Sequence, residues 1–424
     1  MDKQAKLELI TTVMVIGFFL AVLYHYILGK YLGFGYPHDT FLFDPSDKFR
    51  DFLNLLDYRS YYARLFKSST AEGSVFPVMG WVITFFSLIG SAKVSLVCFL
   101  GAFTAVFAAT TWFTVKGESP VVTAKNTVVL VFMSFPVLFV LDRGNFESLV
   151  YLCLLGFVSS YVHGRDLAAV SLLSLAICMK IFPAVFLLLF ISDRKYGQAL
   201  LTVLLTLGLT IIPLSLSPWG LQKSLSSIAF TLNSYNALYA VQDAGLDFGH
   251  SAFGLFKLLL RQCCFAGDLA PFMRPYTVTV LLFFGIVSAH IILIETELWK
   301  KIMLLVAAMC LFPHVSGDYK LLHLYLPLFL FLNTDPEKRA DVRYALLFAL
   351  LLIPKNYRLI IIPSHLWTAS LYPGVVLDPL LLVIFMLLII GQGVKRVRRE
   401  DLLRRFSEHR QALVALLTVR VKQQ

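Results

Sequence analysis

Three aspartates, Asp44, Asp47 and Asp51, lie close together in the polar loop that follows the first apolar run of the chain. A carboxylate at such a place can act as a general base, which takes the proton from a hydroxyl group as that hydroxyl attacks. A second interpretation is structural, because Lys48 and Arg50 would pair with the acids in a solvated loop, or Asp47 would cap a short interfacial helix. The residues of the loop alone leave both interpretations open.

The polar turn of residues 142–147 separates two apolar runs and contains Gly144, Asn145 and Glu147. Glycine permits a tight reversal, and Asn145 or Glu147 would cap the helix that follows. Taken alone, such a turn is structural more often than functional. Lys180 is different, because about a dozen apolar residues flank it on each side, so that it must either extend to the membrane surface or meet an anion.

Further cations follow near the end of the apolar region. Residues 313–323 include His314, Lys320 and His323, which could donate hydrogen bonds to a phosphate. A lone histidine at a helix end is, however, usually an ordinary interfacial residue. A later loop adds Lys355, Tyr357 and Arg358.

Together these residues fit a reaction in which a hydroxyl group attacks a sugar whose leaving group is a lipid phosphate. A phosphate with a second pKa of about 6 can leave without a protonating acid when nearby cations neutralise it. In this scheme Asp51 is the general base, with Asp47 and Asp44 as alternatives, and a single displacement inverts the anomeric centre. The residues assigned to the departing phosphate are Arg143, Lys180, His314, Lys320, His323 and Arg358, and those assigned to substrate binding are Asn145, Asp318 and Tyr357. No cofactor is expected and no metal ligand is assigned, although a divalent metal stays open.

Membrane-embedded helices must position these groups. The chain has 424 residues, of which 58% are hydrophobic and 15% charged, with a mean hydropathy of +0.76. A soluble domain carries far more charge, so this composition predicts an all-α polytopic membrane protein. The run from Leu7 to Leu28 is long enough to span a bilayer, and we interpret it as a retained anchor. The later apolar runs cover 76–91, 94–115, 126–141, 147–162, 166–179, 181–192, 199–215, 276–294, 301–313, 320–332, 343–354 and 374–391, which predicts about 11–13 transmembrane helices, several too short to span alone.

The net charge and the cysteines narrow the class of protein further. The net charge is +11, and much of the excess lies in the tail of residues 395–424. Basic residues beside a last spanning segment indicate a cytoplasmic C-terminus in contact with anionic lipid. Nucleic acid is the weaker interpretation, because the tail lacks an aromatic binding platform. The cysteines lack metal-ligand spacing and are predicted core residues: Cys98, Cys153, Cys178, Cys263, Cys264 and Cys310.

The basic loops predict which polar segments share the non-cytoplasmic face. When membrane crossings are counted back from a cytoplasmic tail, the outer face holds residues 142–147, 217–275, 314–320 and 355–372. When they are counted forward from a cytoplasmic N-terminus, the acidic loop lies on the same face. The two counts differ by one membrane crossing between Phe76 and Val115. Either the segment that begins at Phe76 is re-entrant or interfacial, or another short segment does not cross the membrane.

The chain divides into a transmembrane catalytic domain, 1–394, and a basic cytoplasmic tail, 395–424. Two long outer loops are predicted in the domain, over residues 31–75 and 217–275. The second contains a predicted amphipathic helix over residues 252–261, with apolar residues at helical spacing. This helix would lie on the bilayer or, alternatively, act as a gate over a lipid groove.

The order of these motifs resembles the polyprenol-phosphate-sugar-dependent glycosyltransferases of the GT-C superfamily, particularly glycosyltransferase family 87. The resemblance covers residues 40–330, and it departs from the family pattern at Gly317, where a tryptophan is common, and in the single proline after Phe76. The matching motifs are Asp51-Phe52 with Tyr58, Tyr61 and Tyr62 after it, Phe76-Pro77, Gly144-Asn145, Lys180 to Pro183, and the proline and polar turn that leads into a His-Tyr-rich helix over 313–327.

The resemblance implies a catalytic aspartate in the first outer loop, best matched by Asp51, and a reaction that many members carry out without a metal. It also implies a GT-C-like helix bundle with short helices on its outer face. We therefore expect a multi-pass protein of the inner or plasma membrane that uses a polyprenyl-phosphate sugar as donor and an envelope glycan or glycolipid as acceptor at the periplasmic or exterior face. Membrane lipids are the other expected partners, and nucleic acid is not.

The alternative function is a polytopic lipid or sugar transporter or flippase. Such proteins often show paired halves and charges buried in the middle of helices. Here the ionisable residues lie toward one face and the two halves of the sequence do not match. This asymmetry favours the enzyme.

Overall fold

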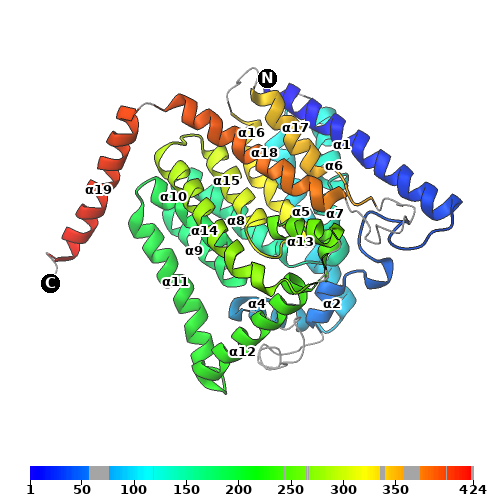
Figure 1. The fold of residues 1–424 in the computed structure, drawn as a ribbon, viewed down its shortest axis with the longest axis horizontal. Coiled ribbons are helices and arrows are strands. Elements are labelled where there is room, and N and C mark those ends of the chain that lie inside the picture. Colours follow the sequence, from blue (N-terminus) through cyan, green and yellow to red (C-terminus); the bar gives the residue numbers. More distant parts are fainter. Residues whose placement is uncertain are drawn as a thin grey trace.

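The computed structural model describes residues 1–56, 76–117, 119–242, 244–263, 265, 267–334, 340–357, 373–397 and 399–421. Throughout these ranges the regular secondary structure is helical (Figure 1), and the one β-type pairing in them is an isolated bridge between Gly249 and Gly317. The predicted all-α class of a polytopic membrane protein is confirmed.

Five of the described helices are long and apolar enough to cross a membrane unaided. They are α1 continued by η1 (Lys3–Tyr31), α5 (Ala92–Val115), α11 (Tyr196–Ser215), α14 (Ala270–Leu293) and α18 (Pro373–Arg396). A sixth span is formed if α6 (Pro120–Phe132) and α7 (Phe135–Arg143), which meet at an angle of 54°, are taken together. Pro136 lies at this break and cannot continue the hydrogen-bond ladder of α6.

Other predicted apolar runs form shorter helices. They are α4 (Pro77–Ser87), α8 (Glu147–Val162), α9 (Asp166–Met179), and η4 (Phe182–Phe186) followed by α10 (Leu187–Ser192). The remaining described elements are η2 (Pro45–Asp47), α2 (Arg50–Leu56), α12 (Gly220–Tyr235), η5 (Asn236–Val241), η6 (Leu246–Phe248), α13 (Ala252–Gln262), α15 (Leu298–Leu311), η7 (Asp318–Leu324), α16 (Tyr325–Leu332), α17 (Ala340–Leu352) and α19 (Arg399–Val421). The helix predicted over residues 252–261 is confirmed as α13.

Helix α15 lies at the centre of the bundle. Every residue from Trp299 to Leu311 is buried, as expected for a helix that is surrounded by protein rather than by lipid. In Figure 1, α1 and α11 form opposite edges of the molecule, and α19 projects from its side. The segment that follows α15 is η7, so the central helix leads directly to the His-Tyr-rich segment of the predicted site.

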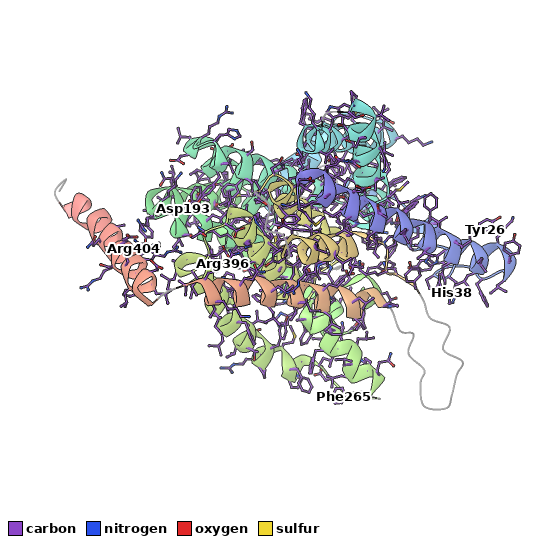
Figure 2. The ribbon with its side chains drawn as sticks, turned by 90° about the horizontal axis from the view of Figure 1, so that it is seen from above. Tyr26, His38, Asp193, Phe265, Arg396 and Arg404 are labelled. Carbon is purple, nitrogen blue, oxygen red and sulfur yellow. The ribbon has the colours of Figure 1, made fainter. Side chains whose placement is uncertain are left out.

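Two groups of described residues mark opposite ends of the molecule. Figure 2 shows Tyr26 and His38 at one end, which we call the loop end, and Asp193, Arg396 and Arg404 toward the other. Aromatic contacts tie the loop end together, because the Phe43 ring lies 5.0 Å from that of Phe248. The first loop and the long loop of residues 217–275 therefore pack against each other.

Ion pairs hold the opposite end together. Lys195 donates to Asp166 at 2.8 Å, Lys301 to Asp193 at 3.3 Å, and Arg396 of α18 to Glu297 at 2.9 Å. Arg194 pairs with Glu408, which connects α19 to the bundle. The predicted boundary between domain and tail, after residue 394, falls within the last turn of α18, and the position of the cytoplasm remains a prediction.

Candidate active site

The acidic loop turns sharply between Asp47 and Asp51. Phe49, which separates η2 from α2, has a φ of +58°, a left-handed conformation that is strained for a bulky residue and is often found at functional sites. Its N–H donates to the carbonyl oxygen of Asp142 at 2.8 Å. This bond fixes the loop against the turn of residues 142–147.

Arg143 joins two of the three predicted acids. Its guanidinium donates to Oδ2 of Asp47 at 2.9 Å and to Oδ1 of Asp51, and it lies over the Phe43 ring at 4.1 Å from the centroid. The sequence assigned Arg143 to the donor phosphate, whereas in the structure this residue is engaged by the acids. A fork of donors on a planar cation suits two carboxylates that approach from one side.

Asn145 completes the contacts of Asp51. Its Nδ2 donates to Oδ2 of Asp51 at 2.7 Å, while its Oδ1 accepts from the backbone N–H of Glu147 at 2.8 Å. Asp51 thus has one partner on each oxygen, and its residual exposure of 26% keeps it reachable from solvent. The predicted capping role of Asn145 is also present, since that N–H belongs to the first residue of α8.

Asp44 is placed differently from the other two acids. Its Oδ1 accepts from the backbone N–H of Ser46 at 2.8 Å and from the hydroxyl of Ser46 at 2.7 Å. These hydrogen bonds lower the pKa of Asp44, because they stabilise its charged form. The side chain of Asp44 therefore caps the N-terminus of the short η2 helix, whereas Asp47 and Asp51 pair with Arg143.

Gly144 brings α2 and the turn into direct contact. It has a φ of +61°, and a Cβ at this position would lie 2.8 Å from Cβ of Phe52. Phe52 is fully buried and stacks on Phe146 at 5.5 Å between ring centroids. The close approach explains the glycine, since a side chain here would push the acid-bearing helix away from the turn.

A second charged cluster is centred on Glu147. Its Oε2 accepts from Nζ of Lys180 at 2.5 Å, and its Oε1 is 2.6 Å from Nε2 of His323. Glu147 and His323 have no exposed surface, and Lys180 is 24% exposed. The anion predicted beside Lys180 is therefore a protein carboxylate, and the sequence had treated this glutamate only as a helix cap.

Lys180 of this cluster and the buried Lys320 each contact an aromatic ring. Nζ of Lys320 lies 3.8 Å from the centroid of Phe182, and Nζ of Lys180 lies 5.0 Å from that of Tyr319. Through this contact with Lys180, the half-buried Tyr319 borders the Glu147 cluster.

The other predicted site residues lie apart from these clusters. Nε2 of His314 is 3.3 Å from both the Met273 carbonyl and the Thr277 hydroxyl of α14. Asp318 is buried and lies 3.1 Å from Nδ1 of His250. Tyr357 stacks on His25 at 5.9 Å between ring centroids. Arg358, and the tyrosines Tyr58, Tyr61 and Tyr62 of the first loop, lie outside the described residues.

His250 forms a buried pair with Asp318, the first residue of η7. Burial lowers the pKa of His250 and outweighs the nearby carboxylate, which raises it. The Nε2 atom of His250 is 3.0 Å from the hydroxyl of Ser316. Asp318 was predicted to bind substrate, and in the structure it joins the long loop to the segment that carries Tyr319 and Lys320.

Sequence reasoning missed Glu147 and Tyr319 as site residues. An acidic residue between two apolar runs is costly to bury, which is the signal that would have singled out Glu147 as the partner of a buried cation. Tyr319 carried no comparable signal, because its importance comes from packing. Across the described ranges, no group of three His, Cys, Asp or Glu side chains is arranged to hold a metal ion.

The arrangement combines a partly exposed carboxylate with nearby cations. Asp51, held by Arg143 and Asn145, can accept a proton. Lys180 and Lys320 can stabilise negative charge that develops on a leaving group. A path of contacts joins the two groups: the Asn145 side chain donates to Asp51 and accepts from the backbone N–H of Glu147, and the side chain of Glu147 separately accepts from Lys180.

Comparison with the models of known protein families gives a match. The model of glycosyltransferase family 87 matches residues 77–314, more than half of the chain. This range includes the turn of residues 142–147 and Lys180, while the acids of the first loop, Lys320 and His323 lie outside it. No curated protein and no solved structure matches the chain. The chain belongs to glycosyltransferase family 87, and this membership makes it a glycosyltransferase.

Proposed function

We propose that this glycosyltransferase moves a sugar from a polyprenyl-phosphate donor to an envelope glycan or glycolipid at the non-cytoplasmic face of the membrane. Asp51 takes the proton from the acceptor hydroxyl as it attacks the anomeric carbon. The bond from that carbon to the phosphate oxygen breaks with inversion, and the polyprenyl phosphate leaves with the bonding electrons. Lys180 and Lys320 neutralise the departing phosphate.

The path of contacts from Asp51 to Lys180 is the observation that carries this proposal. A base and a cation that contact the same short turn suit a displacement in which a proton is lost on one side and negative charge appears on the other. Asn145 and Glu147, the two intermediate residues, belong to the same short turn. The same turn therefore contacts both the base and the cation.

The role of Asp51 is supported by the difference among the three acids. Asp44 has both of its hydrogen bonds inside its own loop, to Ser46. Asp47 shares Arg143 with Asp51 and also lies 3.7 Å from Nε of Arg50. Asp51 alone accepts from Asn145 of the path, and this position favours it as the base.

The length of the short helix α4 supports the proposal that the site residues share one face of the membrane. Its 11 residues extend about 16 Å, which is shorter than a hydrocarbon core of about 30 Å. If α4 does not cross the membrane, the forward and backward counts of crossings agree. The acidic loop, the turn of residues 142–147 and residues 313–320 then share one face, opposite the basic tail.

The test uses the purified full chain with a panel of undecaprenyl-phosphate donors carrying mannose, glucose, galactose or arabinose, and a bacterial glycolipid extract as acceptor. We expect consumption of at least one donor and release of undecaprenyl phosphate, with inverted anomeric configuration by NMR. Asp51→Asn should reduce the rate about 10²- to 10⁴-fold, as for loss of a general base. Asp44→Asn is the matched control and should keep most of the activity.

Three results would contradict the proposal or a part of it. Consumption of none of the donors by a folded wild-type protein would remove the polyprenyl-phosphate chemistry. An Asp51→Asn variant as active as wild type would remove Asp51 as the base, and retention of the anomeric configuration would replace the single displacement by a double one. Thermal unfolding of each variant would show that a lost rate does not reflect a lost fold.

A further inference from the structure

Helix α19 lies against the ends of two spanning helices. Nη1 of Arg405 donates to the carbonyl oxygens of Leu293 at 3.3 Å and of Ile294 at 3.0 Å, where α14 ends. One turn further along α19, Nδ1 of His409 lies 2.7 Å from the hydroxyl of Tyr196, the first residue of α11. Both α11 and α14 are long and apolar enough to cross a membrane. These contacts therefore place α19 at the level where the spanning helices end.

A third spanning helix ends at the same level. Helix α18 ends at Arg396, and only residues 397 and 398 separate it from α19. Arg194, which precedes α11, pairs with Glu408 of α19. Figure 2 shows Arg404 of α19 and Arg396 toward the end of the molecule opposite the loop end. Three spanning helices thus have an end beside α19, which favours a position at the surface of the bilayer rather than within it.

The described side chains of α19 divide into two faces. Those that turn toward the bundle are partly buried, and they include Arg405, Glu408 and His409. The exposed side chains recur at intervals of three and four residues, so they share one side of the helix. This side, the outward face, consists of Leu403, Arg404, Phe406, Ser407, Arg410 and Gln411.

The outward face combines large apolar side chains with arginines. Leu403 and Phe406 are 62% and 61% exposed, and Arg404 and Arg410 are exposed beside them. A helix that lies in the interface of a bilayer has this composition, because its apolar side chains enter the acyl boundary while its cations meet the headgroups. A guanidinium also donates two parallel hydrogen bonds to a phosphate.

The charge of the tail complements an anionic surface. Residues 395–424 contain nine Lys and Arg and three Asp and Glu, a net charge of +6. Arg404 donates to Asp401 at 3.2 Å, but these side chains are 66% and 41% exposed. Exposed ion pairs of this kind contribute little free energy, so a lipid phosphate can replace the carboxylate.

We propose that the outward face of α19 binds the surface of a bilayer that contains anionic phospholipid, with Arg404 and Arg410 on the headgroup phosphates and Leu403 and Phe406 in the acyl boundary. The charge of the tail alone indicates contact with anionic lipid, and the outward face identifies the residues and the orientation of the helix. This inference does not depend on the proposed sugar transfer. The partner is the membrane that surrounds α11, α14 and α18.

The test measures hydrogen–deuterium exchange of α19 in the full chain, which is embedded in nanodiscs of phosphatidylcholine alone or of an equal mixture with phosphatidylglycerol. We expect slower exchange in the mixture, because anionic headgroups attract the arginines. Arg410→Gln should lower the protection of α19 in the mixture about fivefold, which is the contribution of one arginine near an anionic surface. It should leave the protection in phosphatidylcholine unchanged. Phe406→Ser should lower the protection in both lipids, because an apolar anchor acts in either.

The matched control is Lys30→Gln, which removes an exposed cation of η1 and should leave the exchange of α19 unchanged in both lipids. Equal exchange of wild-type α19 in the two lipids would overturn the proposal. An equal loss of protection in both lipids for Arg410→Gln would overturn it too, because the arginine would then stabilise the helix itself. Protection that rises with protein concentration instead of phosphatidylglycerol content would show that a second copy of the chain covers the outward face. Exchange unchanged by Phe406→Ser would remove the apolar anchor.

Discussion

The turn of residues 142–147 supports two charged clusters that are built in opposite ways. In the Arg143 cluster one cation holds two carboxylates, Asp47 and Asp51, which are 36% and 26% exposed. In the Glu147 cluster one fully buried carboxylate lies between Lys180 and the fully buried His323. One cluster thus faces water and the other faces the core.

This difference in burial separates two tasks. Ion pairs at a surface contribute little free energy and exchange partners easily, so the acids of the first cluster remain free to accept a proton. A buried carboxylate is costly unless it is paired, and removing one partner leaves an uncompensated charge. The second cluster therefore holds Lys180 in place, while the first positions a base.

The largest effect should come from the buried cluster. Replacing Glu147 by leucine leaves Lys180 and His323 without their anion, which for a buried pair costs about 3–5 kcal/mol of stability. We expect a melting temperature far below that of wild type, or no folded protein, as measured by fluorescence-detected size-exclusion chromatography over a temperature series. If Glu147→Leu were as stable as wild type, the structural role proposed for the Glu147 cluster would be wrong.

The exposed cluster should respond mainly in rate. Arg143→Gln removes the fork that aligns Asp47 and Asp51, and displacement of a catalytic group by about 1 Å can cost about 10²-fold in rate. The loss of stability should be smaller than for Glu147→Leu. Steady-state kinetics and thermal unfolding of the same preparation separate the two effects. Arg50→Gln is the control, because Arg50 is 59% exposed and lies 3.7 Å from Asp47.

Lys180 should affect donor binding more than acceptor binding. A hydrogen bond to a charged group contributes about 1.5–3 kcal/mol, so Lys180→Met should raise the KM for the donor at least about tenfold. The KM for the acceptor should stay near its wild-type value. Lys195→Met is the control, because it removes a lysine paired with Asp166, and it should change neither KM. If Lys180→Met raised the KM for donor and acceptor equally, that result would argue against a phosphate role for Lys180.

The smallest expected effect is a change of stability with pH that comes from the buried pair of His250 and Asp318. Because burial lowers the pKa of His250, the histidine is neutral in the folded protein over a wider pH range than in the unfolded chain. Stability is then complete above the unfolded pKa of about 6.5 and falls as the pH drops below it. Melting temperatures measured between pH 8 and pH 5 should decline for wild type and less steeply for His250→Gln.

The helices were largely predictable because the apolar runs are continuous and end at polar turns. The run at 166–179 matches α9, and the run at 147–162 matches α8. The run at 126–141 instead becomes two helices that meet at 54°, although Pro136 was visible in the sequence. A proline ends a helix or bends it, and packing around it decides which occurs.

The site was predictable in its parts but not in its pairings. The sequence singled out Asp51, Arg143, Asn145 and Lys180, and the structure places Asp51, Asn145 and Lys180 along one path of contacts, with Arg143 paired to Asp51. It could not show that Arg143 would meet acids rather than a phosphate. That outcome depends on Phe49, whose left-handed backbone turns the loop. Contacts between distant segments, such as Glu147 with His323, arise from tertiary packing that local sequence patterns do not encode.

The tight contact between Gly144 and Phe52 also limits which residues this position can accept. A Cβ at residue 144 would lie 2.8 Å from Cβ of Phe52, so even alanine would force α2 and the turn of residues 142–147 apart. Asp51 lies on α2 and its two partners, Arg143 and Asn145, lie on the turn. One added methyl group would therefore disturb both contacts of the proposed base at once.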